Sequence, residues 1–477
     1  MLWIVPAGDN KALDEITYEY EEIAQEITYE GAEASEIDYN YTAEEGADDF
    51  FADFSEDARF LVYELERMHP FFLWPGQMPE NYPVIRQTFL AGTARSMYHV
   101  DFALAMRRYL AAFPDGHMAG VTTYNELGHA VAFPLSGVTQ RTFSARPNGL
   151  FLRDDSGITS IEIIQIGGVY VEEIYKIIDA HFGSYNEFGR WNQRGRQVRC
   201  QRMLEMAGVN IIYDNGNLYV LLTTAQNIQI VSNITPRREL LERAARTAGT
   251  PTVFLPPGPR YRRIDDDILF ISYNGMSIMP CLQTIAATQT AILDGTRHFV
   301  LDFRNSPGGS ERFLDSLFEA MGLGVATMGT LIIPSGLSEH GLDFHITQGH
   351  LQGWTLEELE DIDYLLIPPS FEDVYNRYGV FIAILTSHFT YSAGPMIASR
   401  IVDSGFGAVI GEPPGSSPSL IGSGRTLDLP ISRFRIRAAA DISLRPDADA
   451  DAHVLWPCII IDEEYALDAA LELLRSR

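Results

Sequence analysis

The sequence predicts a mixed α/β protein, with a helical and a β-rich segment ahead of an α/β domain. From residue 267 onward, short apolar strands alternate with helical stretches, which is typical of a sheet flanked by helices. Before it, residues 53–113 carry apolar side chains at helical spacing, and residues 130–262 alternate short apolar strands with turn signals. The length of 477 residues is enough for about three domains.

These patterns divide the chain into four segments. We predict an acidic, disordered arm over residues 1–52, a helical subdomain over 53–125, a β-rich region over 126–262 and an α/β domain over 263–477. The boundaries fall where the spacing of apolar residues changes from helical to alternating and then to strand–helix alternation.

Much of the acidic excess lies in the arm and just after it. The chain has 64 acidic and 35 basic residues, a net charge of −29, and seventeen of the acidic residues fall between Asp14 and Asp57 without a Lys or Arg. Self-repulsion and low hydrophobicity argue against a packed core there. The arm is either a flexible tether or a docking segment anchored by the Ile and Tyr of its repeat at 15–19 and 26–30. No basic run is found in the chain, so no nucleic-acid partner is predicted.

Each expected element is delimited by turn residues or by its apolar spacing. A Pro at position 70 ends the first helix, and a Pro-Asp-Gly turn ends the second. The helices are expected over 61–68, 102–113, 281–293, 393–403 and 465–474, with a further one from 311. Strands are expected over 268–273, 299–303 and 379–385 and around the turn at 214–216, and residues 161–177 are expected to form a strand, a Gly-Gly turn and a helix.

The chain lacks the signals of several other protein classes. Cys200, Cys281 and Cys458 lie far apart and form no CxxC pair, so no zinc site, redox motif or disulfide framework is expected. No apolar run approaches the roughly 20 residues of a membrane helix. Residues 1–8 are apolar but too short for a signal peptide, and whether they are the trimmed end of one stays open.

Ser392 is the first candidate for chemistry. An apolar strand runs into a short polar turn, and a helix of small residues follows directly after Ser392. Such a turn lifts a hydroxyl to the end of a sheet and to a helix N-terminus, where free N–H groups favour developing negative charge. The alternative is a plain N-cap serine, which this position also suits.

A serine nucleophile needs a base, and the residue inventory favours histidine. The chain has two lysines, Lys11 and Lys176, and neither follows Ser392. His117 is projected from an Asp-Gly turn after a helix, which is a suitable position for a base. The alternatives are a turn-capping or surface role for His117.

His388 and His453 are rival candidates for the base. A third element is the strand around residues 299–303, which ends in a turn containing Gly308 and Gly309. Glycines let backbone N–H groups approach a ligand closely, as an oxyanion hole requires. The alternative is an ordinary turn between a strand and a helix.

Together these motifs resemble the C-terminal processing (tail-specific) family of serine peptidases, of S41 type, in its tricorn-like, lysine-free branch. The matching stretches occur in the family's order, at 115–117, 301–309, 390–393, 410–412, 429–430 and 445–447. The resemblance implies a ClpP/crotonase-like ββα catalytic domain over 263–477. It also implies a PDZ-like middle region, where the family's Asn-Gly turn is replaced by glycines at 167 and 168; a β-rich spacer is the alternative.

The resemblance also implies roles for individual residues. Ser392 would attack the peptide carbonyl, and His117 would take its proton and return it to the leaving amine. The backbone N–H of Ala393, with that of Gly308 or Gly309, would hold the oxyanion.

The residue that orients the base departs from the family's pattern. A Glu is expected six residues before a Pro-Asp pair, and here Asp451 stands six residues before Pro457, which Cys458 follows. Asp451 is therefore the candidate orienting residue, with a solvated acidic loop as the alternative. Glu412 is expected to support the turn near the site, and residues 413–417 stand where the lysine-dependent branch has its lysine.

The resulting prediction is a serine endopeptidase that hydrolyses polypeptides through an acyl-enzyme on Ser392, without cofactor or metal. The alternative is a catalytically impaired member of the same fold that binds a peptide or another ligand. The resemblance implies an exported or envelope-associated protein, with a membrane tether only through a missing export signal.

Overall fold

A computed structural model describes most of the chain after residue 50. The chain divides into two units, residues 1–45 and 46–477, and only the second contains described residues. The predicted acidic arm over residues 1–52 therefore lies almost wholly outside the described part. The described residues are 51–73, 80–113, 115–118, 121–124, 130–132, 137–139, 142–154, 157–215, 217–236, 259–273, 278–309, 312–337, 342, 345–346, 351, 353–359, 362, 364–421 and 424–477.

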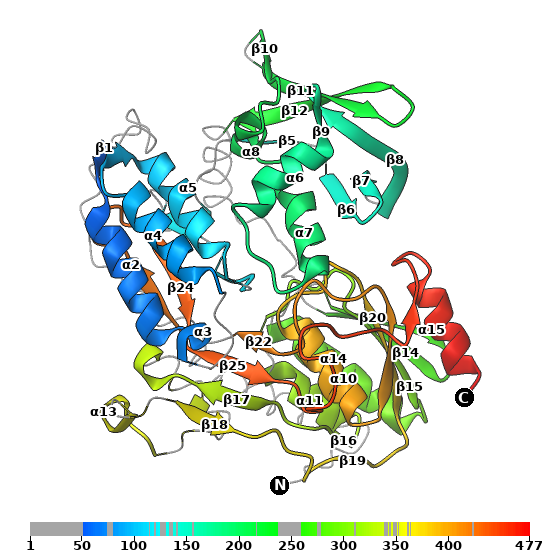
Figure 1. Ribbon diagram of the computed structural model, residues 1–477. Helices are drawn as coiled ribbons and strands as arrows, with labels where there is room; N and C mark the ends of the chain where they lie inside the picture. Colours follow the sequence, from blue (N-terminus) through cyan, green and yellow to red (C-terminus); the bar gives the residue numbers. More distant parts are fainter. Residues whose placement is uncertain are drawn as a thin grey trace. The chain divides into compact units, whose positions relative to one another are not determined.

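The predicted α/β class is confirmed, and its centre is a six-stranded sheet (Figure 1). The first pair of strands is antiparallel and all the others are parallel. In spatial order the strands are β13 (Arg260–Asp265), β14 (Ile268–Ser272), β15 (His298–Asp302), β20 (Phe381–Thr386), β21 (Gly407–Gly411) and β26 (Ile459–Ile460).

Helices cover both faces of this sheet. Apolar residues of α10 (Ile278–Leu293), α11 (Arg312–Ala320) and α14 (Ala393–Asp403) form one buried cluster with the sheet. The apolar side of α15 (Ala466–Arg475) forms a second cluster with residues from the other face. Burial on both faces explains why these parallel strands read as continuous apolar runs in the sequence.

The N-terminal helices pack on strands from the end of the chain. These helices are α2 (Ser55–Met68), α3 (Pro70–Leu73), α4 (Tyr82–Gly92) and α5 (His99–Leu110). Their buried residues share one core with residues of β24 (Arg435–Ala439) and β25 (Asp441–Leu444). The buried Asp57 carboxylate accepts hydrogen bonds from the backbone N–H groups of Ile431 and Ser432, both at 2.7 Å. The predicted helical subdomain (53–125) thus shares one core with part of the predicted α/β domain (263–477), and the domain division stays a prediction.

The described part of the middle region is an antiparallel sheet with three helices. Its main path is β5 (Gly137–Thr139), β12 (Gln229–Pro236), β11 (Asn217–Thr224), β8 (Gly157–Ile166), β7 (Gly149–Asp154) and β6 (Thr142–Arg146), with β9 (Val169–Tyr170) and β10 (Ile212–Asp214) at its side. The predicted strand, Gly-Gly turn and helix are present: both glycines have positive φ, and α6 (Val171–Asp179) follows. The sequence did not predict α7 (Glu187–Gln197) or α8 (Gln201–Met206).

Helix α7 lies close against neighbouring backbone through two glycines. A Cβ on Gly189 would lie 2.2 Å from the carbonyl oxygen of Gly415, and one on Gly195 would lie 3.1 Å from that of Phe143. The side chain of Asn192 donates a hydrogen bond to the backbone of His388 at 3.2 Å. These contacts fix the middle region to the loops at the carboxyl end of the central sheet.

Short strands complete the described structure. They form small sheets with the order β1–β2, β16–β19, β18–β17–β25–β22 and β23–β24–β3–β4. Their bounds are β1 (Phe51–Asp53), β2 (Ser96–Tyr98), β3 (Val121–Tyr124), β4 (Ala130–Ala132), β16 (Leu323–Gly324), β17 (Gly329–Ile332), β18 (Leu365–Ile367), β19 (Tyr375–Asn376), β22 (Leu420–Ile421) and β23 (Gly424–Asp428), with the short helices η1 (Pro334–Gly336) and α13 (Leu356–Leu359).

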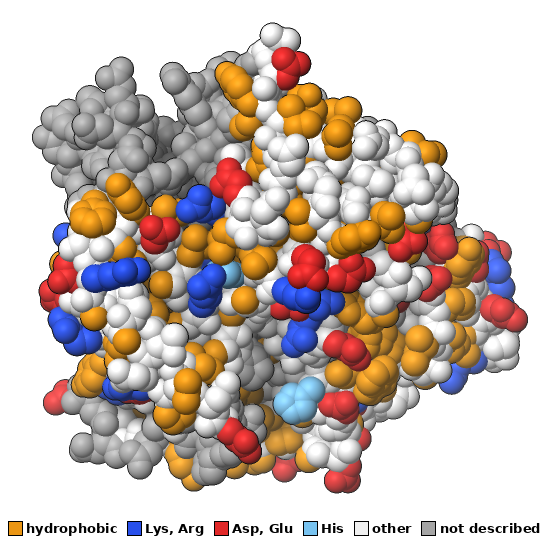
Figure 2. Space-filling view, turned by 45° about the horizontal axis from the view of Figure 1, so that its top comes forward, with side chains coloured by type: hydrophobic (Ala, Val, Ile, Leu, Met, Phe, Trp, Pro, Cys, Tyr) orange, Lys and Arg blue, Asp and Glu red, His pale blue; other side chains and the backbone are white. Residues whose placement is uncertain are grey.

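On the face displayed in Figure 2, basic side chains form small separate groups among acidic and hydrophobic ones. Within the described ranges, no helix is both long and apolar enough to cross a membrane. Among the same residues, no group of three or more His, Cys, Asp or Glu side chains is placed to hold a metal ion.

Candidate active site

Ser392 lies at the turn between β20 and α14, as predicted. Its backbone has φ 56° and ψ −122°, a conformation that non-glycine residues rarely adopt. Such strain costs about 1–3 kcal/mol and is typical of functional turns, among them the nucleophile turn of hydrolases. Although Ser392 is the N-cap residue of α14, its side chain makes no capping hydrogen bond. The hydroxyl is therefore free for another role, and the plain N-cap interpretation does not apply.

The glycine turn after β15 lies directly against Ser392. Strands β15 and β20 are parallel neighbours, so their carboxyl ends meet at one edge of the sheet. The backbone N–H of Tyr391 donates to the carbonyl of Ser306 at 3.0 Å, which ties the two loops together. A Cβ on Gly308, which has φ 92°, would lie 2.3 Å from the Cβ of Ser392. Only glycine fits at this position.

The backbone N–H groups predicted for an oxyanion hole belong to the residue after Ser392 and to the glycine turn beside it. Ala393 is the first residue of α14, and N–H groups in the first turn of a helix have no acceptor within the helix. The N–H of Gly308 points to Ser306 Oγ at a long 3.4 Å, and Gly309 follows with φ 140°. The predicted oxyanion residues Ala393, Gly308 and Gly309 are therefore grouped beside Ser392.

His117 meets Ser392 across 275 positions of sequence. Its Nε2 lies 3.3 Å from Ser392 Oγ, which is within hydrogen-bonding reach and slightly long, as is common without substrate. The turn that carries His117 follows α5, and its backbone N–H donates to Asp115 Oδ1 at 2.8 Å. A Cβ on Gly116 would meet the hydroxyl oxygen of Tyr391 at 1.9 Å, so a larger residue here would displace that side chain.

The other ring nitrogen of His117 bonds to a tyrosine rather than to a carboxylate. His117 Nδ1 makes a short hydrogen bond with the hydroxyl of Tyr185, which in turn donates to Asp115 Oδ1 at 2.9 Å. Asp115 is 1% exposed, and its second oxygen lies 3.2 Å from His69 Nε2. A chain of hydrogen bonds thus runs from the half-buried Ser392 and His117 through Tyr185 to the buried Asp115.

These contacts determine which nitrogen of His117 carries the proton. Burial raises the pKa of Asp115, but the hydrogen bond and charge of His69 and the proximity of His117 outweigh burial and lower it. An ionised carboxylate only accepts, so the single hydroxyl hydrogen of Tyr185 goes to Asp115. The Tyr185 oxygen must then accept from Nδ1–H of His117. This leaves the lone pair of Nε2 facing Ser392 Oγ, as a general base requires.

We expect the acid limb of the pH profile of kcat/KM to lie below the ordinary histidine pKa of 6.5. Burial lowers the pKa of His117, Asp115 raises it, Arg437 lowers it, and the net shift is downward. Arg437→Gln removes a positive charge, so it should move the limb toward higher pH. The profile of kcat/KM reports ionisation of the free enzyme. Arg95→Gln, which removes an exposed arginine, is the control, and an acid limb above 6.5 would contradict the expectation.

Asp451 does not lie where the sequence-based prediction requires it. Its carboxylate accepts hydrogen bonds from the backbone N–H groups of His453 and Val454, at 2.8 and 3.1 Å, and from the indole of Trp456 at 3.1 Å. No hydrogen bond joins it to His117 among the described residues. The short side chain of Asp451 closes its own exposed loop, which is the alternative role that the sequence also allowed. Tyr185 occupies the position beside Nδ1 of His117.

The rival histidines are also placed away from Ser392. His388 is fully buried, with Nδ1 2.7 Å from Glu412 Oε2 and Nε2 3.3 Å from Ser144 Oγ. Both of its ring nitrogens are therefore occupied. His453 lies in the exposed loop that Asp451 closes.

Glu412 connects three parts of the chain beneath the site. Besides His388, its carboxylate pairs with Arg146 of the middle region and lies 3.4 Å from the backbone nitrogen of Glu463. Burial raises the pKa of Glu412, but the hydrogen bond and charge of His388, with the charge of Arg146, outweigh burial and lower it to about 2. These contacts agree with the structural role expected for this residue.

Glu412 is expected to stabilise the fold above pH 4.5 and to lose this effect in acid. A carboxylate whose pKa falls from 4.5 to about 2 on folding contributes on the order of 3 kcal/mol at neutral pH. The contribution disappears as the pH falls from about 4.5 to 2. The difference in free energy of unfolding between wild type and Glu412→Gln should therefore shrink over that range, measured by denaturant unfolding. A difference that is independent of pH would contradict this assignment.

The sequence analysis missed Tyr185 and His69, which both contact Asp115, and gave Asp115 itself no role. Tyr185 lies just ahead of the unpredicted helix α7, whose N-cap Asn186 accepts from the N–H of Gly189 at 2.8 Å. An Asn followed by an acidic residue was the available signal for this helix start. Two glycines in the helix weakened its periodic pattern. No local signal connects either Tyr185 or His69 to His117.

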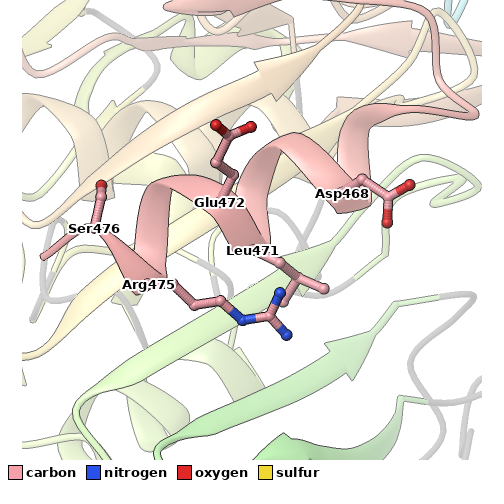
Figure 3. A pocket seen from close by; sticks show the side chains of 5 residues that line it. All are labelled: Asp468, Leu471, Glu472, Arg475 and Ser476. Atoms are coloured by element: carbon pink, nitrogen blue, oxygen red, sulfur yellow. The ribbon is translucent and has the colours of Figure 1, made fainter.

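A separate shallow hollow lies on the C-terminal helix α15 (Figure 3). Figure 3 shows Arg475 and Leu471 on one side of the helix and Glu472 on the other. Arg475 pairs with Asp265 of β13 at 2.7 Å, which holds the helix to the edge of the sheet. No residue of the Ser392 site lines this hollow.

The fold is similar to solved structures of CPAF. Mature CPAF matches with a TM-score of 0.58 and 14% identity, over 89% of this chain and 95% of that one. Mature CPAF complexed with lactacystin matches with a TM-score of 0.55 and 13% identity, over 89% of this chain and 97% of that one. The photosystem II D1 C-terminal processing protease is more distant, with a TM-score of 0.44 and 12% identity over 86% of this chain and 92% of that one. No protein-family model and no curated protein matches the sequence. At these identities the likeness concerns the fold alone.

Proposed function

We propose that the protein is a serine endopeptidase that uses Ser392 as nucleophile and His117 as general base. The observation that carries the proposal is the 3.3 Å approach of His117 Nε2 to Ser392 Oγ. The strained, uncapped conformation of Ser392 and the glycine turn beside it support the same function. Membership of the S41-type family is part of the proposal, supported by the order of the motifs and by the fold shared with CPAF.

The proposed mechanism has two steps. Ser392 Oγ attacks the peptide carbonyl while its proton passes to His117 Nε2, and the resulting oxyanion accepts from the N–H of Ala393 and of Gly308 or Gly309. The C–N bond then breaks, and His117 gives the proton to the leaving amine, which leaves an ester on Ser392. A water molecule that loses its proton to His117 hydrolyses this ester and restores the free serine.

Asp115 and Tyr185 are positioning residues in this proposal, in place of Asp451. When Nε2 of His117 gains a proton, the imidazolium keeps its Nδ1–H bond to the Tyr185 oxygen. The buried Asp115 carboxylate stabilises that charge through the hydroxyl between them. The neutral Tyr185 hydroxyl thus connects the His117 imidazolium to the Asp115 carboxylate. In the usual catalytic triad the carboxylate contacts the histidine directly.

Labelling with a fluorophosphonate tests the nucleophile directly. The wild-type chain should be labelled and should cleave an unfolded protein substrate, whereas Ser392→Ala should do neither. Ser476→Ala, which removes an exposed serine from the C-terminal helix, should behave as the wild type. Labelling that persists in Ser392→Ala would exclude this residue as the nucleophile. Unlabelled and inactive wild type would favour the peptide-binding alternative.

The finer assignments belong to the same proposal. They are the tricorn-like, lysine-free branch, a ClpP/crotonase-like catalytic domain and a PDZ-like middle region. Polypeptides are the proposed substrates, and export or association with the cell envelope is the proposed location. Fractionation of cells that express the tagged full-length chain would test the location.

A further inference from the structure

A cavity of about 430 Å³ lies beside Ser392. Its lining comes from α7 and the neighbouring strands β6 and β7 on one side, and from the loops of Pro307 and Tyr391 on the other. Pro307 directly precedes Gly308, and Tyr391 directly precedes Ser392. Two lining residues are therefore direct chain neighbours of the glycine turn and of the proposed nucleophile. A substrate side chain next to the scissile bond would lie in this cavity.

The charge of the lining has one sign. Arg153, Arg196 and Arg199 line the cavity, and no Asp or Glu is among the described residues that do. The contrast with the chain's net charge of −29 is large. Guanidinium groups gathered in a hollow concentrate positive potential and attract an anionic group.

The protein holds one of these arginines in place. Arg153 donates to Asn305 Oδ1 at 2.9 Å, and its guanidinium carbon lies 4.3 Å from the centre of the Phe389 ring. Its second terminal nitrogen lies 3.8 Å from Glu463, so part of its charge is already balanced. Arg153 therefore shapes the wall and contributes a partly neutralised charge.

The other two arginines come from α7 and the residues after it. Arg196 makes no hydrogen bond or ion pair with another residue in the described part of the chain, and it is exposed. Arg199 is half-buried, and this burial lowers the pKa of its guanidinium. A planar guanidinium group binds a carboxylate through two parallel hydrogen bonds. Arg196 is free to make such a pair with a ligand.

We propose that this cavity binds the carboxylate of an Asp or Glu side chain next to the scissile bond. The proposal rests on the proposed peptidase function and adds a substrate class to it. Arg196 is the main partner of the carboxylate, and Arg199 adds charge from the same segment. A carboxylate at the substrate's C-terminus has the same chemistry, so the experiment must separate the two sources.

Cleavage-site mapping is the first part of the test. Digestion of an unfolded protein by the full-length chain, followed by mass spectrometry, should show Asp or Glu enriched at a position flanking the cut bond. Internally quenched peptides with acetylated and amidated ends then carry Glu or Gln at that position. We expect kcat/KM to be at least about 10-fold higher for the Glu peptide. Arg196→Gln should bring this ratio close to one, and Arg95→Gln should keep it at the wild-type value.

Three results would overturn the proposal, and they can be told apart. Equal kcat/KM for the two peptides, with Ser392 still labelled by fluorophosphonate, would exclude the carboxylate site and leave the peptidase function intact. A preference that appears only with a free peptide C-terminus would assign the cavity to the terminal carboxylate. Absence of both labelling and cleavage in the wild-type chain would overturn the peptidase function, and the substrate class with it.

Discussion

Replacing Ser392 with alanine is expected to reduce kcat for peptide hydrolysis by at least about 10⁴-fold. The substitution removes the only hydroxyl within hydrogen-bonding distance of His117 Nε2 among the described contacts. Hydrolysis of an internally quenched peptide by the purified variant measures the loss. Any residual rate would come from the oxyanion N–H groups and from substrate binding.

The same variant should fold as the wild type does. Ser392 makes no capping hydrogen bond, and alanine meets the same backbone strain at φ 56°, so the thermal unfolding midpoint should move little. Ser476→Ala is the matched control for loss of a serine hydroxyl elsewhere. Activity of Ser392→Ala within about 10-fold of the wild type would contradict the assignment, since that is far less than loss of a nucleophile produces.

Asp115→Asn is expected to lower kcat by roughly 10²–10⁴-fold, because it removes the charge that stabilises protonated His117. The amide oxygen can still accept from the Tyr185 hydroxyl and from the backbone N–H of His117, so the hydrogen bonds remain while the charge is lost. Tyr185→Phe should have a smaller effect, on the order of 10–100-fold, because it removes the bridging hydroxyl and leaves the Asp115 charge in place.

A pH profile separates this positioning effect from a general loss of structure. The Asp115 charge raises the pKa of His117, so Asp115→Asn should move the acid limb of kcat/KM to lower pH. Asp451→Asn is the matched control, because it removes the carboxylate that the sequence alone would have chosen. Loss of activity in Asp451→Asn, with Asp115→Asn active, would restore the original prediction.

The sequence predicted three of the six strands of the central sheet, because local pattern suffices there. Apolar strands bounded by turns located β14, β15 and β20, and the small residues after Ser392 located α14. The same signals identified Ser392, His117 and Gly308, because each lies in a turn with its own local signature. Parallel pairing of β15 and β20 brings two of those turns together.

The parts that sequence could not predict depend on contacts distant along the chain. Helix α7 contains glycines that lower helix propensity and that are needed where backbone approaches closely. Tyr185 stands 68 positions after His117, in a segment without a recognisable motif. Asp451 was chosen by its distance from a proline, a rule that fails when a shorter side chain folds back on its own loop.

The order in which the residues of the site occur along the chain has a consequence for synthesis. The base comes early, its tyrosine partner follows in the middle region, and the serine is added only after more than three quarters of the chain exists. A ribosome-bound intermediate therefore exposes an imidazole with no hydroxyl to activate, and a fragment of residues 263–477 has the hydroxyl without its imidazole. Under the proposed mechanism, hydrolysis therefore begins only after Ser392 has been synthesised, which protects the earlier nascent chain from cleaving itself.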